Sequence, residues 1–453
     1  MKVLKFGGTS VGSAESLKNV KSIVESINGP VVVIVSALGG LTDRLIATAK
    51  TAAANDLTYL EEVEAMTERH LNIIDNVIDE CNRRDVKDTV LSLLSDLKRM
   101  YDGVYLIRHL PQMTLDIIVS YGERMSSVIV AAMIKGGSRH DSLKFVKTEK
   151  WYDKNIADQK LTTHLIKEEF SKPFDKAIVP GFISTDCKTG DITNLGRGGS
   201  DFTAALVAAA LDAEILEIWT DVDGFLSADP RIVSDAILVP HMTFIESMEL
   251  CSFGAKVIYP PTIYPVFHKN IPIRILNTFN PSAKGTLITD SSCEGDLNVK
   301  GISAIRDTTL FHLGGNISGK LKNTVSRTFN ALAKKGVKVF NVNRNDEKSG
   351  MSFAVAKADA DVTYDLLCRE FAPELSKGSL SLPERIDNVA TIAVVGENMK
   401  YNSRLGARIR HTLSRDGISV EGHSEGASDT TMAYVVDSSK VDDALRHIHT
   451  LVF

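Results

Sequence analysis

Two glycine-rich segments, far apart in the sequence, most constrain how this chain can fold. The first runs from Leu4 to Gly12 and reads LKFGGTSVG, and the second runs from Asn194 to Asp201 and reads NLGRGGSD. Each lies between an expected strand and an expected helix. Glycines let backbone N–H groups approach a bulky anion, while lysine suits a phosphate and the arginine fork suits a carboxylate. Together the segments predict one site that holds a phosphoryl donor beside a carboxylate acceptor.

Strand and helix patterns alternate through the first part of the chain. Apolar runs at residues 2–6, 31–35 and 177–180 read as strands, and helical spacing begins after Ser13, a plausible helix cap. The segment 200–213, SDFTAALVAAALDA, is apolar on almost every face and predicts a buried helix with Asp201 as its N-cap. This alternation favours an α/β core with a mainly parallel sheet. The glycine-rich motifs then fall at the carboxyl ends of strands, where such sheets bind ligands.

Between these motifs lies a long charged region. Residues 45–108 carry many acidic and basic side chains without a strand pattern, which predicts helices with a solvated face. The segment 116–126, DIIVSYGERMS, reads as a strand that runs into a helix. His70 and His109 stand alone, and we read neither as a ligand.

The last third of the chain contains an internal repeat. Gly315 and Gly396 follow similar apolar runs, and Gly336 and Gly417 stand at the same offset, about 81 residues. Each copy reads strand, helix, strand, strand, helix, strand, which is a ferredoxin-like βαββαβ unit. We therefore expect a catalytic domain at 1–290 and two smaller domains at 298–385 and 386–453, which could exchange strands.

Composition excludes several classes of function. The net charge is −5, so no basic field favours nucleic acid or an anionic membrane. The five cysteines are scattered without a CxxC pair, which speaks against a disulfide framework or a thiolate zinc site and fits a reducing cytoplasm. We see no signal peptide, and the longest apolar run, residues 30–35, is too short to span a bilayer.

Five motifs, in order, resemble those of aspartate kinases: LKFGGTSVG, then SYGE at 120–123, NLGRGGSD, WTDVDG at 219–224 and FGAKV at 253–257. The resemblance covers essentially the whole chain. It implies an amino-acid kinase fold, with a mainly parallel sheet sandwiched by helices, followed by two ferredoxin-like ACT domains. The family transfers the γ-phosphoryl group of ATP to the side-chain carboxylate of L-aspartate, giving 4-phospho-L-aspartate in the first step of lysine, threonine and methionine biosynthesis. The repeats look most like the aspartokinase half of bifunctional aspartokinase–homoserine dehydrogenases.

The resemblance also implies roles for single residues. The implied catalytic residues are Lys5, Asp201 and Lys256. The implied ATP site comprises Lys5, Gly7, Gly8, Ser10, Thr220, Asp221, Leu226, Arg231 and Lys256. The implied aspartate site comprises Ser36, Thr42, Glu123, Arg197, Gly198, Gly199 and Ser200. No metal-binding cluster is expected, because Mg²⁺ would be held mainly by the ATP phosphates.

The chemistry of the family explains these residue types. A carboxylate acceptor is already ionised at neutral pH, so catalysis would depend on positioning and cations rather than on a general base. Lys5 would stabilise the transferring phosphoryl group, and Asp201 would orient the lysines around that group. Arg197 would grip a substrate carboxylate while Glu123 holds the ammonium group. Taken alone, Lys5 reads as a surface lysine at a strand end, and Glu123 as a carboxylate at a helix start.

The chain departs from the family pattern at four positions. Asp43 stands where the family has asparagine, and Leu226 stands where it tends to have tyrosine. Tyr259 and Pro261 replace a histidine and a basic residue. The last three affect the expected shape of the nucleotide pocket.

Paired ACT units in the family bind an amino-acid effector, and lysine is our first expectation here, followed by threonine. The implied effector residues are Gly315, Asn316, Ile317, Val339, Asn341 and Asn343. A βα turn that binds nothing is the plainer alternative. We also expect a homodimer formed through the ACT sheets.

Two alternatives remain at this point. One is a related amino-acid kinase acting on glutamate, acetylglutamate or another acid, against which the full motif set and the two repeats weigh. The other is a pseudokinase that senses amino acids, against which the intact Lys5, Arg197, Asp201 and Lys256 weigh. A substrate panel and an assay with ATP, Mg²⁺ and aspartate separate the three possibilities.

Overall fold

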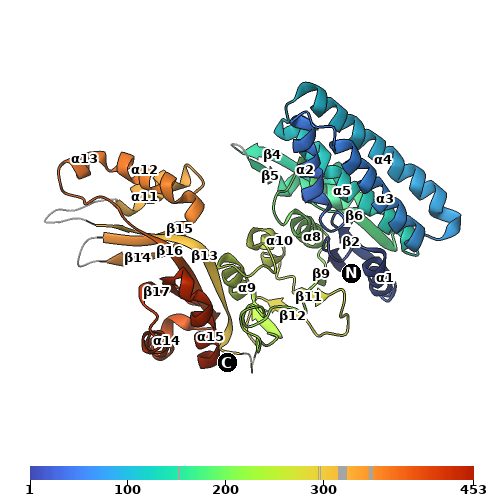
Figure 1. The fold of residues 1–453 in the computed structure, drawn as a ribbon. Helices are drawn as coiled ribbons and strands as arrows, with labels where there is room; N and C mark the ends of the chain where they lie inside the picture. The colour runs from blue at the N-terminus through green and yellow to red at the C-terminus, as the bar shows by residue number, and fades with distance from the viewer. Residues whose placement is uncertain (152–153, 294, 296, 315–323, 346–349) are drawn as a thin grey trace. The chain divides into compact units, whose positions relative to one another are not determined.

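The computed structural model describes residues 1–453 except 152–153, 294, 296, 315–323 and 346–349 (Figure 1). These residues form two compact units. The first comprises Met1–Phe225 and Ile258–Ser291, and the second comprises Leu226–Val257 and Ser292–Phe453.

The first unit contains the following helices and strands, in chain order: β1 (Lys2–Phe6), α1 (Ala14–Glu25), β2 (Val31–Val35), α2 (Leu41–Ala53), α3 (Tyr59–Val77), α4 (Glu80–Ile107), α5 (Gln112–Met133), β3 (Gly137–Arg139), α6 (Ser142–Phe145), β4 (Lys147–Trp151), β5 (Lys154–Ala157), α7 (Gln159–Glu169), β6 (Lys176–Pro180), β7 (Ile183–Asp186), β8 (Ile192–Asn194), α8 (Gly199–Ala210), β9 (Ile215–Thr220), α10 (Tyr264–Phe267), β11 (Ile273–Asn277) and β12 (Thr286–Thr289).

The second unit contains β10 (His241–Thr243), α9 (Phe244–Ser252), β13 (Val299–Leu313), α11 (Thr324–Ala333), β14 (Val339–Asn345), β15 (Gly350–Ala356), α12 (Ala360–Glu370), α13 (Ala372–Ser376), β16 (Glu384–Gly396), α14 (Ser403–Arg415), β17 (Val420–Ser428), β18 (Thr431–Asp437) and α15 (Val441–Val452).

The main sheet of the first unit is mostly parallel, as the sequence predicts. Within this unit its strands follow the order β12-β11-β9-β1-β2-β6-β3. β1 pairs in parallel with β2 and with β9, and only β12 of this set pairs in the antiparallel sense, with β11. A smaller sheet has the order β5-β4-β7-β8.

Side chains of β1 alternate between the two faces of this sheet. Leu4 and Phe6 join the large apolar cluster that includes Leu17 of α1 and Leu41 of α2. Lys5 therefore points to the opposite face, where α8 packs against β1. The helix predicted at 200–213 is α8, and most of its residues are buried, as expected.

Helices α2, α3, α4 and α5 pack against one another beside the sheet (Figure 1). The predicted helical character of residues 45–108 is confirmed. The strand predicted around Ile117, Ile118 and Val119 is wrong, because these residues lie within α5. Helix α5 is buried on several faces between its neighbours, so its short apolar run has no helical periodicity to distinguish it from a strand.

The second unit is built on one antiparallel sheet with the order β14-β15-β13-β16-β18-β17. β13 and β16 are long central strands that pair along nearly their whole length. Their register shifts at three places on β13: between Val299 and Gly301, between Ile305 and Thr308, and between Thr308 and Leu310. β14 and β15 flank β13, whereas β18 and β17 flank β16.

The second repeat does not follow the predicted order of elements. Within the described residues, α15 is the last element of the second repeat. The place of the predicted final strand next to β16 is taken by residues 299–305, the first half of β13, which precede the first repeat. One long strand thus serves both repeats, which sequence periodicity does not reveal.

Helix α15 packs within the second unit on the segment Leu226–Val257. Ser227 Oγ and His449 Nε2 lie 2.8 Å apart, and both side chains are buried. Arg446 Nε donates to the Ile232 carbonyl at 3.1 Å. These bonds tie the C-terminal helix to a segment that lies far earlier in the sequence.

Candidate active site

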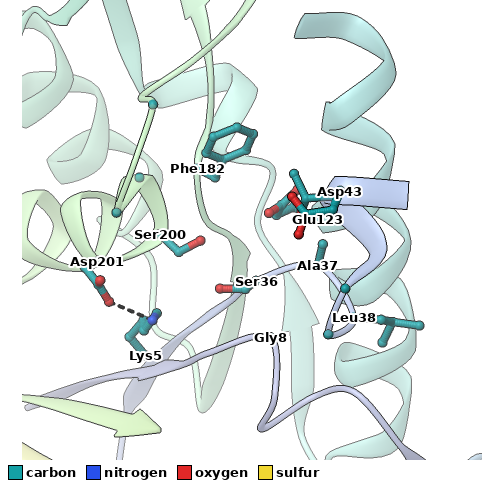
Figure 2. Close-up of a pocket in the computed structure, with 16 residues that line it drawn as sticks. Lys5, Gly8, Ser36, Ala37, Leu38, Asp43, Glu123, Phe182, Ser200 and Asp201 are labelled. Carbon is teal, nitrogen blue, oxygen red and sulfur yellow. Dashed lines mark ion pairs between the residues drawn. The ribbon is translucent and has the colours of Figure 1, made fainter. Parts of the chain in front are cut away.

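A cavity of about 330 Å³ opens in the first unit, where β1, β2 and β6 end at the same edge of the sheet. Residues from both glycine-rich segments line this one cavity (Figure 2). The lining comprises Lys5, Gly8, Ser36, Ala37, Leu38, Gly39, Gly40, Thr42, Asp43, Glu123, Phe182, Gly196, Gly198, Gly199, Ser200 and Asp201. Its volume falls in the range of small-molecule sites.

Lys5 and Asp201 form an ion pair on one wall of the cavity (Figure 2). Lys5 Nζ lies 2.7 Å from Asp201 Oδ1, and the two side chains are only 12% and 13% exposed. A buried carboxylate that is paired in this way keeps the ammonium in one place. Because Lys5 has three N–H donors, it keeps donors for a ligand while it is paired with Asp201.

Asp201 is not the N-cap of α8. Gly198 holds that position with φ of +70°, and Asp201 lies in the first turn of the helix. A side chain in this turn lies near the positive end of the helix dipole. The cap prediction was wrong because a glycine in the left-handed conformation, rather than an acidic side chain, begins the helix.

Glu123 lies on another wall, beside Asp43 (Figure 2). It belongs to the middle of α5 and not to a helix start, so the helix-start interpretation is wrong. The residue is 3% exposed, and its Oε2 has no hydrogen-bond partner among the described residues. Burial raises the pKa of Glu123 to about 8, although a hydrogen bond from the Ala37 N–H lowers it in part. The cavity thus contains a carboxyl group that is mostly protonated at neutral pH.

The loop after β2 forms the wall between these two groups. Ser36 follows the strand, and its N–H donates to the Phe6 carbonyl at 3.2 Å. Ser36 and Thr42 both line the cavity, as does Asp43. Helix α5 approaches this loop closely, because a Cβ on Gly122 would lie 2.7 Å from Ala37 Cβ. Glycine at this position therefore lets α5 bring Glu123 into the cavity.

Of the first glycine-rich segment, only Lys5 and Gly8 line the cavity. Gly8 lines the cavity, but the Gly7 N–H donates to the Trp219 carbonyl at 3.1 Å, so it is already used. Ser10 is fully buried, and its hydroxyl lies 2.7 Å from Thr278 Oγ1. Both residues hold the loop to the sheet, and neither directs a polar group into the cavity.

In the second glycine-rich segment, Gly198, Gly199 and Ser200 line the cavity, whereas Arg197 does not. The Arg197 side chain is exposed, and its guanidinium lies 6.0 Å from the centre of the Tyr259 ring. A Cβ on Gly198 would lie 2.7 Å from Tyr259 Cβ, so glycine is needed for this close packing.

The residues implied for ATP are divided between the two units. Thr220 ends β9 in the first unit and Asp221 follows it, and the Thr220 hydroxyl donates to Asp221 Oδ1 at 3.2 Å. Leu226, Arg231 and Lys256 belong to the second unit. Arg231 is exposed and bonds through two nitrogens to Asp229 in the same turn, at 2.9 and 2.6 Å.

The effector residues fall on the first repeat. Gly315, Asn316 and Ile317 lie outside the described residues. Val339, Asn341 and Asn343 lie on β14. Asn343 Nδ2 donates to the His423 carbonyl at 2.9 Å. Asn341 has φ of +46°, and its buried Oδ1 has no hydrogen-bond partner among the described residues.

Phe182 is a cavity residue that sequence reasoning missed. It follows β6 and has φ of +66°, a conformation that is strained for an aromatic residue. Its N–H donates to Thr203 Oγ1 at 3.0 Å, and its carbonyl accepts from the Leu195 N–H at 2.9 Å. The only signal in the sequence is a large residue directly after Pro180-Gly181 at a strand end.

Comparison with known proteins gives two family matches. The model of the amino acid kinase family matches residues 1–277, and an ACT domain model matches residues 392–451. None of the described helices is long and apolar enough to cross a bilayer.

Among curated relatives, a bifunctional aspartokinase/homoserine dehydrogenase of Haemophilus influenzae is 32% identical, covering 100% of this chain and 56% of that protein. The chain spans about half the length of the first curated relatives it matches.

The fold agrees with two solved structures of E. coli aspartokinase III. The complex with aspartate and ADP has a TM-score of 0.83 at 24% identity and covers 99% of both chains. The complex with lysine and aspartate has a TM-score of 0.73 at 25% identity, covering 100% of this chain and 99% of the other. These matches confirm the resemblance and the predicted fold class. Because the family model accounts for more than half of its length, this chain belongs to the amino acid kinase family.

Proposed function

We propose that this chain is an aspartate kinase that transfers the γ-phosphoryl group of ATP to the side-chain carboxylate of L-aspartate. The observation that carries the proposal is the arrangement of two unlike groups around one cavity. The Lys5–Asp201 pair supplies a fixed cation on one wall, and the buried carboxyl of Glu123 awaits a cation on another. An amino acid with an acidic side chain has an ammonium group that can pair with Glu123 and a carboxylate that can pair with Lys5. Relatives with aspartokinase names support this assignment.

The geometry suggests how the reaction proceeds. The substrate ammonium would bond to Glu123, which then ionises because the added cation favours the charged form. The side-chain carboxylate of the substrate would point towards Lys5, whose remaining N–H groups can contact the transferring phosphoryl oxygens. The backbone N–H groups at the start of α8 add positive potential at the same wall. Charge stabilisation by fixed groups, rather than proton removal, would lower the barrier.

The nucleotide would be ATP with Mg²⁺. Among the described residues, no three His, Cys, Asp or Glu side chains gather as a metal site. Small hard Mg²⁺ commonly keeps few protein ligands and stays on substrate phosphates. When bound, the metal would neutralise phosphate charge, while Lys5 stays near the acceptor and Asp201 holds Lys5 in place.

We further propose that residues 1–290 form the catalytic domain and that 298–385 and 386–453 form regulatory domains. The orphan oxygen of Asn341, on β14, supports an amino-acid effector near that strand. Lysine is the first candidate, because E. coli aspartokinase III has been solved with lysine, and threonine is the second. A homodimer through the ACT sheets and a cytoplasmic location complete the proposal, and five scattered cysteines without a CxxC pair fit such a location.

The test is a hydroxamate assay with ATP, Mg²⁺ and a panel of aspartate, glutamate and acetylglutamate. The wild type should respond to aspartate, and Lys5→Met should lower kcat by about 100-fold or more. Lys2→Met is the matched control, because Lys2 lies on the same strand and pairs with Glu217 at 2.8 Å, outside the cavity lining. A wild type that acts only on another acid, or Lys5→Met with undiminished turnover, would refute the proposal.

A further inference from the structure

Arg69 of α3 lies outside the lining of the cavity but connects two of the loops that form it. Its Nη2 donates to the carbonyl of Gly12 at 2.9 Å and to the carbonyl of Gly39 at 2.9 Å. Gly12 belongs to the loop after β1, and Gly39 belongs to the loop after β2. One nitrogen atom therefore bridges the two loops.

These loops touch through bare backbone. A Cβ on Gly39 would lie 3.0 Å from the Gly8 carbonyl oxygen, and a Cβ on Gly12 would lie 3.4 Å from Gly39 N. No backbone hydrogen bond among the described residues joins 7–12 to 37–40. Two carbonyl oxygens that face the same region repel each other, so a guanidinium between them satisfies both acceptors and removes this repulsion.

The bridge starts from a rigid element. Met66 and Ile74 of α3 are fully buried, and so is His70, whose Nδ1 lies 2.6 Å from the Met66 carbonyl oxygen. The nearby Arg44 is engaged elsewhere, because its Nε lies 2.6 Å from Glu62 Oε2. Arg69 is therefore held by the helix core at one end and by the two loops at the other.

We propose that Arg69 is a positioning residue for phosphoryl transfer. By joining Gly12 to Gly39, it sets the separation between the cavity wall that carries Lys5 and Gly8 and the wall formed by the loop after β2. This role rests on the proposed function, because it places the two reactants at the distance that in-line transfer requires. The sequence gives no hint of it, since a single arginine in a charged helix reads as part of a solvated face.

The experiment compares Arg69→Met, Arg69→Lys and the control Arg83→Met. Arg83 also donates to a backbone carbonyl, that of Ile78 at 3.1 Å, but on α4 and away from the cavity lining. Arg69→Met should lower kcat by about 10- to 100-fold, the cost of a misplacement near 1 Å, while KM for aspartate changes less. Its thermal unfolding midpoint should fall no further than that of Arg83→Met. Arg69→Lys should recover part of kcat, because an ammonium can also donate to two carbonyls.

Hydrogen exchange tests the bridge independently of turnover. Amides of residues 7–12 and 37–41 should exchange faster in Arg69→Met than in the wild type, and Arg83→Met should leave them unchanged. Unaltered exchange, or a full kcat in Arg69→Met, would overturn the positioning role. A wild type that does not phosphorylate aspartate would instead refute the proposed function, and the exchange result would still decide whether Arg69 holds the loops.

Discussion

Glu123→Gln should make the protein more stable while it impairs substrate binding. Burial raises the pKa of the Glu123 carboxyl from 4.5 to about 8. Between these two values the folded state binds one proton that the unfolded state has lost. The stabilising contribution of this group is therefore complete below pH 4.5 and is lost as pH rises through 8. Glutamine is neutral at every pH and avoids this loss.

The magnitude follows from the shift. Each pKa unit corresponds to about 1.4 kcal/mol. The free energy of unfolding of Glu123→Gln, relative to that of the wild type, should therefore increase by about 3–4 kcal/mol between pH 5 and pH 8. At pH 5 the two proteins should have similar stability, since a neutral carboxyl and an amide have nearly the same shape. KM for aspartate should rise by about 10- to 100-fold, because a bond to a charged group is lost.

Urea unfolding at pH 5, 6, 7 and 8, followed by tryptophan fluorescence, measures this effect. Both tryptophans, Trp151 and Trp219, belong to the first unit, so the signal reports on the unit that contains Glu123. Glu64→Gln makes the same chemical change at an exposed position of α3 and should alter stability by less than about 0.5 kcal/mol. If the stability difference between the wild type and Glu123→Gln did not vary with pH, the buried neutral carboxyl would be refuted.

Three further predictions concern other parts of the molecule. Aspartate binding at pH 7 should release up to one proton, because the substrate ammonium favours the ionised form of Glu123. Calorimetry in two buffers with different heats of ionisation measures the number of protons released. Equal proton release at pH 7 and pH 9 would contradict this prediction. Gly198→Ala should destabilise the first unit by about 2–3 kcal/mol, because φ is +70° and the new Cβ would lie 2.7 Å from a side chain. Gly190→Ala, with φ of +75° and open space around it, should cost only about 1 kcal/mol in urea unfolding, and an equal cost at both positions would exclude the clash. His449→Ala should lower the stability of the second unit by about 1–3 kcal/mol in circular dichroism, because Ser227 loses a buried partner; an unchanged midpoint would show that this bond contributes nothing.

Local patterns predicted the elements that carry the main chemistry. The alternation of β1 places Lys5 opposite Leu4 and Phe6, and the apolar sequence of α8 predicts its burial beside that strand. The two glycine-rich motifs fall at one edge of the sheet because parallel strands end together there. Lys5 and Asp201 could therefore be expected to lie close, and they are 2.7 Å apart.

Other features depend on contacts that no local pattern records. The Gly7 N–H looks available in the sequence, but strand β9 uses it through Trp219. Ile117 to Val119 have the composition of a strand, yet packing on several sides makes them part of α5. The burial of Glu123 depends on how closely Gly122 approaches Ala37, and the bridge from Arg69 depends on two loops that are remote from it in sequence.

The shared strands β13 and β16 also determine how the C-terminal region can be divided. A fragment that stopped at residue 385 would lose nearly all of β16 and leave the first half of β13 without its neighbour. The exposed backbone N–H and C=O groups of β13 would form an unpaired edge strand, which favours aggregation. The two repeats therefore form one continuous sheet, and a cut between them would break its central strand pair.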